Sequence, residues 1–201
     1  MATGEQVIER LMPLTGQIHS TLHRQLRAQQ IAGQVPMAGK GGGKSAAHYD
    51  ARHLAAVLIG LAAVRPGAAP DAVEELGSLP YLECGYAPNP PLPTLQAMLA
   101  DQLCRIVDAM FSGQRAEATT TGRYRAMEVS FCFKPLRATI VGYHGSRIIY
   151  AYATEPGPKW ALRRVTILSG DLLVAAAELL ADTLTAASVP AGRYHLKRAA
   201  R

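Results

Sequence analysis

Apolar residues in the first third of the chain recur at the three- and four-residue intervals of amphipathic helices. An apolar face in residues 4–12 predicts a short helix, which Pro13 is expected to end. A longer helix is predicted for residues 15–32, and a third begins at Asp50, its N-cap, and runs to about residue 64. The apolar stripe of the second helix consists of residues spaced four apart: Leu14, Ile18, Leu22 and Leu26. The pattern therefore predicts an N-terminal helical unit.

In the second half of the chain the pattern changes from helical spacing to alternation. Amphipathic helices are predicted for residues 94–111 and 171–187. Between them, four segments have the pattern of strands: residues 128–133, 138–143, 147–152 and 160–168. A three-residue turn containing Gly145 joins the middle two as a hairpin. The expected fold class is α+β, with an N-terminal helical domain and a C-terminal four-stranded antiparallel sheet with helices.

Prolines divide the two halves. Seven of them fall in residues 66–93, which is typical of a linker or an irregular arm. The expected organisation is thus a helical domain in residues 1–65, a Pro-rich linker in residues 66–93, and an α+β domain for dimerisation or partner binding in residues 94–201.

The net charge of +6 over 201 residues is unevenly distributed. Residues 1–65 have seven Lys/Arg against three Asp/Glu, whereas residues 66–113 have one against six. Residues 114–201 have thirteen against six. A basic N-terminal third favours a polyanionic partner, while the charge of the C-terminal segment is also typical of an ordinary solvated surface.

Several classes of protein are not expected from the sequence. The cysteines Cys84, Cys104 and Cys132 are widely spaced and have no His at ligand spacing, so a zinc site is not predicted. Their odd number and the polar N-terminus indicate a reducing cytoplasm. The longest apolar run, residues 54–64, is too short to span a bilayer. Common hydrolase motifs are missing, so no catalytic residue, metal or cofactor is predicted.

A glycine- and lysine-rich segment, Gly39-Lys40-Gly41-Gly42-Gly43-Lys44, lies between the second and third predicted helices. Such a segment either holds a phosphate in a nucleotide site or lies as a flexible basic loop against nucleic acid or solvent. Gly43-Lys44-Ser45 matches the end of the Walker A pattern, but Ala38 stands where that pattern has its first glycine. No good strand precedes the segment, and the next helix begins only near Asp50. A small nucleotide-binding enzyme using Lys44 is therefore the less favoured alternative.

The second predicted helix has polar residues opposite its apolar stripe: Ser20, His23, Arg24 and Arg27. Such side chains contact phosphates and base edges in DNA-binding proteins, although a solvated surface helix has the same pattern. The candidates for phosphate contacts are Arg24, Arg27, Lys40, Lys44 and Arg52, and those nearest to base edges are Ser20 and His23. Gly41, Gly42 and Gly43 would let the backbone approach a duplex without a Cβ in the way.

The order of these features resembles the winged-helix DNA-binding domain of MerR-type regulators. Leu14-Thr15-Gly16 corresponds to the turn, Thr21-Leu22-His23-Arg24 to the core of the recognition helix, and Gly33-Gln34-Val35-Pro36 to the step before the wing. Residues 40–44 correspond to the wing and Tyr49-Asp50 to the start of the next helix. The chain departs from that family in its longer recognition helix, in glycines where the wing has arginines, and in lacking a long C-terminal coiled coil. The resemblance covers less than a third of the chain and implies a winged-helix-like fold with double-stranded DNA as its partner.

The expected function is DNA binding, by a transcription regulator or a mobile-element DNA-binding factor that acts as a dimer. Helices 94–111 and 171–187 have more apolar surface than one small sheet requires, so one of them is expected to be shared between subunits. The alternative is an interaction or assembly protein that does not bind nucleic acid and works through its sheet.

Overall fold

The computed structural model describes residues 3–37, 48–82, 94–111, 124–133, 136–144, 146–153 and 165–188. The helices of these residues are α1 (Gly4–Thr15), α2 (His19–Ile31), α3 (Ala51–Gly60), α4 (Ala69–Gly77), α5 (Leu95–Phe111) and α7 (Gly170–Ser188), with a 3₁₀ turn η2 (Pro66–Ala68). The strands are β1 (Tyr81–Leu82), β2 (Glu128–Phe133), β3 (Leu136–His144), β4 (Ser146–Ala153) and β5 (Val165–Ser169). The predicted α+β fold class is confirmed.

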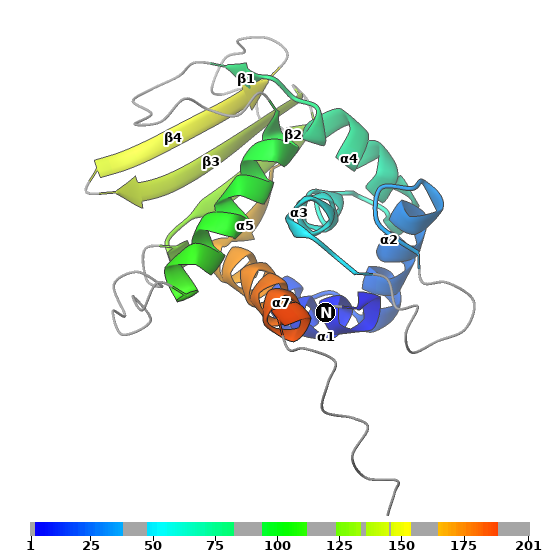
Figure 1. The fold of residues 1–201 in the computed structure, drawn as a ribbon. Coiled ribbons are helices and arrows are strands. Elements are labelled where there is room, and N and C mark those ends of the chain that lie inside the picture. The colour runs from blue at the N-terminus through cyan, green and yellow to red at the C-terminus, as the bar shows by residue number, and fades with distance from the viewer. Residues whose placement is uncertain are drawn as a thin grey trace, which may run out of the picture.

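Helix α3 lies at the centre of the helical part of the protein. Figure 1 shows it end-on, surrounded by α1, α2, α4, α5 and α7, with the sheet beyond α5. Every residue from Leu54 to Gly60 is buried, as expected of a helix that is apolar on all sides. Asp50 begins the helix as predicted, because its carboxylate accepts a hydrogen bond from the backbone N–H of His53 at 2.9 Å.

The sheet has five antiparallel strands, not the predicted four, in the order β1-β4-β3-β2-β5. The additional strand, β1, comes from the Pro-rich segment, and its two residues are too few to show alternation. Tyr81 of β1 lies opposite Tyr152 of β4, and the two rings pack edge to face with centroids 5.7 Å apart. Central strand residues Val129, Phe131 and Ile140 are buried in the same core as the helices.

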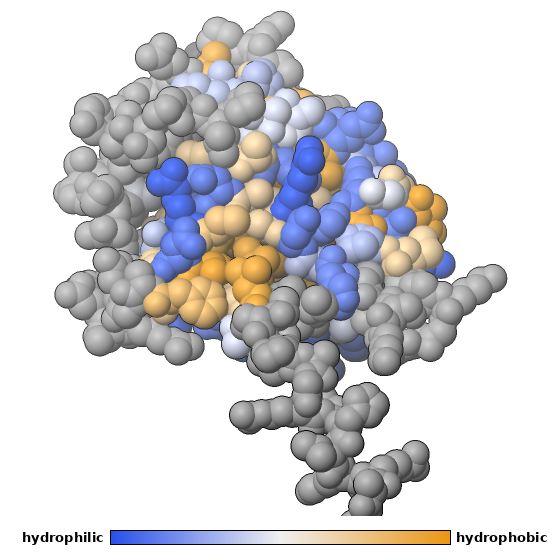
Figure 2. Space-filling model, viewed as in Figure 1, coloured by the Kyte–Doolittle hydropathy of each residue, from blue (hydrophilic) through white to orange (hydrophobic). Residues whose placement is uncertain are grey.

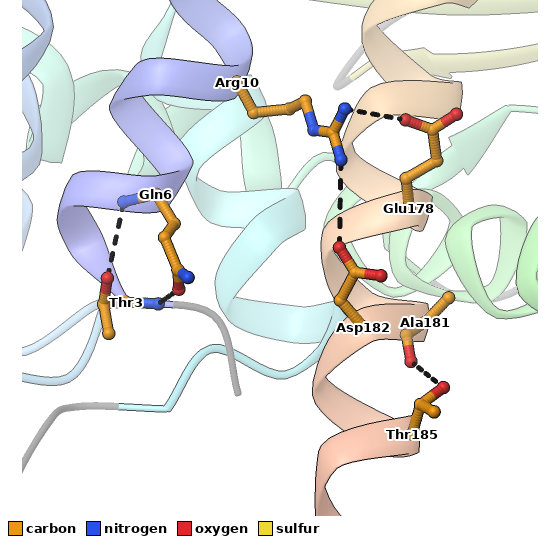
Figure 3. A network of polar contacts seen from close by, with 7 residues as sticks. All are labelled: Thr3, Gln6, Arg10, Glu178, Ala181, Asp182 and Thr185. Atoms are coloured by element: carbon orange, nitrogen blue, oxygen red, sulfur yellow. Dashed lines mark hydrogen bonds and ion pairs between the residues drawn. The ribbon is translucent and has the colours of Figure 1, made fainter.

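The two ends of the described chain meet in this core. Helix α1 packs against α7, where the Arg10 guanidinium lies 3.4 Å from the Glu178 carboxylate and 3.8 Å from that of Asp182 (Figure 3). The core continues from Val7 to Leu180. Within the segment expected to be a linker, residues 66–82 form η2, α4 and β1. The expected boundaries at residues 65 and 93 therefore do not separate two cores among the described residues.

The first two helices differ from their predicted bounds. Helix α1 continues through Pro13, which lies in its last turn and therefore removes only one backbone hydrogen bond of the helix. The helix ends at Gly16, which adopts the left-handed conformation (φ 64°). Helix α2 begins only at His19. Leu14 and Ile18 are consequently not part of α2, and they are 42% and 68% exposed. The predicted apolar stripe of the second helix is therefore wrong in its first half, because the turn at Gly16 separates Leu14 and Ile18 from α2.

The inner face of α2 is instead half polar. It consists of Leu22, Gln25, Leu26 and Gln29, all of them buried. The Gln29 side-chain amide donates a hydrogen bond to the Ala56 carbonyl oxygen of α3 at 3.0 Å, and Gly60 leaves the space that this amide occupies. The Gln29 hydrogen bond thus joins α2 to the central helix α3, and the missing side chain of Gly60 makes room for it.

Most of the apolar surface of α5 and α7 is covered within the subunit. Helix α5 packs against α3 and α7, and α7 also packs against α1. Phe111 and Leu184 stay exposed, at 57% and 50%. Figure 2 shows hydrophobic residues gathered over the C-terminal end of α5 and the neighbouring part of α7. The surplus apolar surface noted in the sequence therefore serves mainly to enclose α3 and to hold α1. No helix among the described residues has the length and apolar character needed to cross a membrane.

Candidate nucleic-acid interface

Four of the predicted site residues form one exposed surface on α2, here named the basic face: Ser20, His23, Arg24 and Arg27. The opposite side of the helix packs into the core through Leu22 and Gln29. Gly16 produces the turn from α1, so α2 begins beside the end of α1 and extends along the edge of the molecule (Figure 1). The fold thus holds the basic face toward solvent along most of the helix.

The two arginines of the basic face differ from three other exposed arginines of the described chain. Arg10, Arg105 and Arg125 each form an ion pair with a carboxylate, at distances of 3.4, 2.6 and 3.6 Å. In the described ranges, neither Arg24 nor Arg27 has such a partner. Their charges are therefore available to an anion outside the protein.

A histidine that was not among the predicted site residues lies beside this face. His19 Nε2 lies 2.8 Å from the Glu5 Oε1 of α1, and its ring stacks on that of His23 with centroids 6.2 Å apart. The contact with Glu5 holds His19 against α1, and the ring of His19 in turn packs against the ring of His23. The four-residue spacing of the two histidines was the available sequence signal, but the partner carboxylate comes from another helix.

The Gly-rich segment between α2 and α3 falls largely outside the described residues, and with it the predicted site residues Lys40, Gly41, Gly42, Gly43 and Lys44. The chain on both sides of it is described. The side-chain amide of Gln30, on α2, donates to the Pro36 carbonyl oxygen at 3.4 Å and to the Tyr49 hydroxyl at 3.2 Å. Tyr49 is fully buried, and this burial raises the pKa of its hydroxyl despite the hydrogen bond from Gln30. The Gln30 side chain thus joins the chain just before the segment, at Pro36, to the chain just after it, at Tyr49.

Arg52, the last predicted phosphate contact, lies on a different surface. It is exposed in the first turn of α3 and lines a cleft with Gly33 and Gln34 after α2, with α4, and with the start of α5. The residues of the basic face do not line this cleft. The structure therefore brings together four predicted residues and places Arg52 apart from them.

The helix after the Gly-rich segment does not begin where a phosphate-binding loop requires. Helix α3 begins at Ala51, well beyond Ser45, whereas the helix of a Walker A loop begins at the Lys-Ser step. Before the segment, residues 31–37 form the end of α2 and turns, without a strand. In the parts of the chain that the structure describes, no three His, Cys, Asp or Glu side chains group together to hold a metal ion.

Comparisons with protein-family models, curated proteins and solved structures give no match. The resemblance of residues 7–61 to the MerR-type winged helix therefore stays a prediction from the sequence, and the function of the basic face is argued below from its own chemistry.

Proposed function

We propose that the protein binds double-stranded DNA, with the basic face of α2 against the phosphates and the base edges. The observation that carries this proposal is the pair of arginines on one exposed helix face. Among the described residues, Arg24 and Arg27 have no carboxylate partner, while Arg10, Arg105 and Arg125 are each paired. Unpaired guanidinium groups in a row are suited to bidentate contacts with phosphate oxygens.

The dimensions of α2 suit the major groove of a duplex. A helix of 13 residues is about 20 Å long, and a single exposed helix fits a groove about 12 Å wide. Ser20 and His23 lie in the N-terminal half of α2, which is the part of a recognition helix that usually contacts base edges. Arg24 and Arg27 follow on the same face and would contact the sugar-phosphate backbone.

The composition of the basic face favours a duplex over a single strand. Proteins that bind single strands place exposed aromatic side chains where bases stack. Helix α2 has no Phe, Tyr or Trp, and the nearest tyrosine in sequence, Tyr49, is fully buried. The face therefore offers phosphate contacts and hydrogen bonds to base edges, which is the chemistry of recognition in the major groove of a duplex.

A single helix of this kind contacts one half-site, so tight binding requires a second copy related by a two-fold axis. A transcription regulator and a mobile-element DNA-binding factor would both use the surface in this way. The Gly-rich segment would add Lys40 and Lys44 as phosphate contacts, and Gln30 joins the described residues on its two sides, Pro36 and Tyr49.

The test is the salt dependence of binding to several unrelated duplexes. Replacing Arg24 and Arg27 together by Ala should weaken binding to all of them and lower the slope of log K against log salt by about two, since each lost phosphate contact removes about one unit. The matched control replaces Arg105 and Arg125 by Ala, which removes the same charge from paired arginines elsewhere. Equal losses in both variants, or none in the first with the fold intact, would exclude α2 from the interface.

A further inference from the structure

A second surface of the molecule has the features of a small-molecule site. It is an open cleft of about 570 Å³, which is within the range of roughly 300–1,000 Å³ typical of ligand pockets. Four segments far apart in sequence form its walls: the turn after α2, the first turn of α3, the C-terminal half of α4 and the start of α5. None of the residues of the basic face contributes to it, so the cleft is independent of the proposed DNA surface.

Two side-chain amides hold these walls together. Gln34, after α2, donates from Nε2 to the Pro70 carbonyl oxygen of α4 at 2.9 Å. Gln96, at the start of α5, donates from Nε2 to the Arg52 carbonyl oxygen of α3 at 3.2 Å. Each bond joins two different walls of the cleft. The cleft is therefore preformed, which reduces the entropy lost on binding a ligand.

Two walls of the cleft carry opposite charges that do not form an ion pair with each other. Arg52 on α3 and Glu74 on α4 both line the cleft and are both exposed. Neither forms an ion pair within the described ranges, whereas Arg10, Arg105 and Arg125 each do. Among the described residues, the cleft thus has an unpaired cation on one wall and an unpaired anion on another.

Hydrogen-bonding groups accompany each charge. On the cationic wall, Nδ1 of His53 lies 3.3 Å from the Asp50 backbone nitrogen and 2.9 Å from Asp50 Oδ1, so Nε2 is the ring nitrogen left for a ligand. On the anionic wall, the Ser78 hydroxyl donates to the Glu74 carbonyl oxygen at 2.6 Å, which leaves its oxygen lone pairs as acceptors. Each charge thus has a second polar side chain on its own wall, His53 with Arg52 and Ser78 with Glu74.

We propose that this cleft binds a small zwitterion, whose amino group pairs with Glu74 and whose carboxylate or phosphate group pairs with Arg52. A ligand that supplies both charges satisfies both walls, whereas an anion or a cation alone leaves one wall unpaired. The volume accommodates a molecule of the size of a short peptide.

Calorimetric titration of the full-length protein tests this proposal. The probes are trialanine, which has an amino and a carboxylate group, and phosphoethanolamine, which has an amino and a phosphate group. Saturable binding of either one is expected and identifies which anionic group the site prefers. The same peptide with an acetylated N-terminus or an amidated C-terminus should bind about tenfold more weakly or not at all. Failure of both zwitterions to bind at millimolar concentration, or equal binding of the blocked peptides, would overturn the proposal.

Substitutions assign the binding to this cleft. Arg52→Gln and Glu74→Gln should each weaken binding about tenfold or more, because each removes one of the two charges. Glu75→Gln is the matched control on α4, and Arg65→Gln is the matched control for the arginine; both residues are exposed and lie outside the cleft. Thermal unfolding of every variant checks the fold. Unchanged binding by Arg52→Gln and Glu74→Gln, or equal weakening by the controls, would place the ligand elsewhere and overturn the assignment.

Discussion

Replacing Gly60 by Ala should destabilise the protein, although the same change usually stabilises a helix. In an ordinary helix, alanine is favoured over glycine by about 1 kcal/mol. Here a Cβ on residue 60 would lie 2.0 Å from Nε2 of Gln29 and 3.0 Å from its Cδ. Gln29 is 1% exposed, so its amide has no empty space to enter and must give up its hydrogen bond to Ala56.

The expected magnitude follows from these contacts. Leaving a buried donor unpaired costs about 1–3 kcal/mol, and overpacking a close-packed site costs a further 1–3 kcal/mol. After subtraction of the helix-propensity gain, Gly60→Ala should lower the free energy of unfolding by roughly 1–5 kcal/mol, measured by urea denaturation. Gly67→Ala is the control, since a Cβ there meets nothing within 4 Å and should change stability by less than about 0.5 kcal/mol.

A double-mutant cycle isolates the cause. In a Gln29→Ala background the obstructing amide is gone, so adding Gly60→Ala should now stabilise the protein by up to about 1 kcal/mol. The reversal of sign between the two backgrounds is the specific expectation. A stabilising or neutral Gly60→Ala in the wild-type background, or the same effect in both backgrounds, would refute the proposed contact between α2 and α3.

Two other residues give sharp expectations for stability. At Gly170 a Cβ would lie 2.2 Å from the Tyr124 carbonyl oxygen, and because backbone cannot move aside as a side chain can, Gly170→Ala should cost several kcal/mol, about 3 or more, in urea denaturation. The raised pKa of Tyr49 means that the unfolded chain ionises this hydroxyl first. Its contribution to stability should therefore be present below pH 10.0 and decrease as the pH rises above that value. Tyr49→Phe should remove this part of the alkaline loss, seen in urea midpoints between pH about 9 and about 11, and an identical loss in both proteins would contradict the burial of the hydroxyl.

The sequence predicted best those elements whose signals are local. Helices α5 and α7 were predicted to within one residue at each end, because continuous apolar periodicity fixes them. The start of α3 was found from Asp50, whose capping interaction involves only the next turn. The antiparallel hairpin of β3 and β4 also follows from alternation and a short turn.

Features that depend on distant residues were not predictable in this way. Nothing in the spacing of Leu14 and Ile18 shows that Gly16 adopts a positive φ and separates them from α2. Strand β1 is defined by its pairing with β4, and its two residues are too few to show the alternation of polar and apolar residues that predicts a strand. The polar face of α2 was correctly placed, since helical geometry alone determines it. The cleft with Arg52 and Glu74 was missed, because its walls come from four separate segments.

The enclosure of α3 has a consequence for the synthesis of the protein. Its apolar residues 54–60 are made early, whereas α5 and α7, which cover two of its sides, are made much later. At about 5–20 residues per second, on the order of ten seconds pass between the synthesis of α3 and that of the end of α7. During that interval the apolar segment of α3 lacks the helices that cover it in the folded protein, so the nascent chain exposes apolar surface that favours aggregation. The same delay makes chains truncated before Gly170 prone to aggregation, because α1 and α3 would both lack the helix against which they pack.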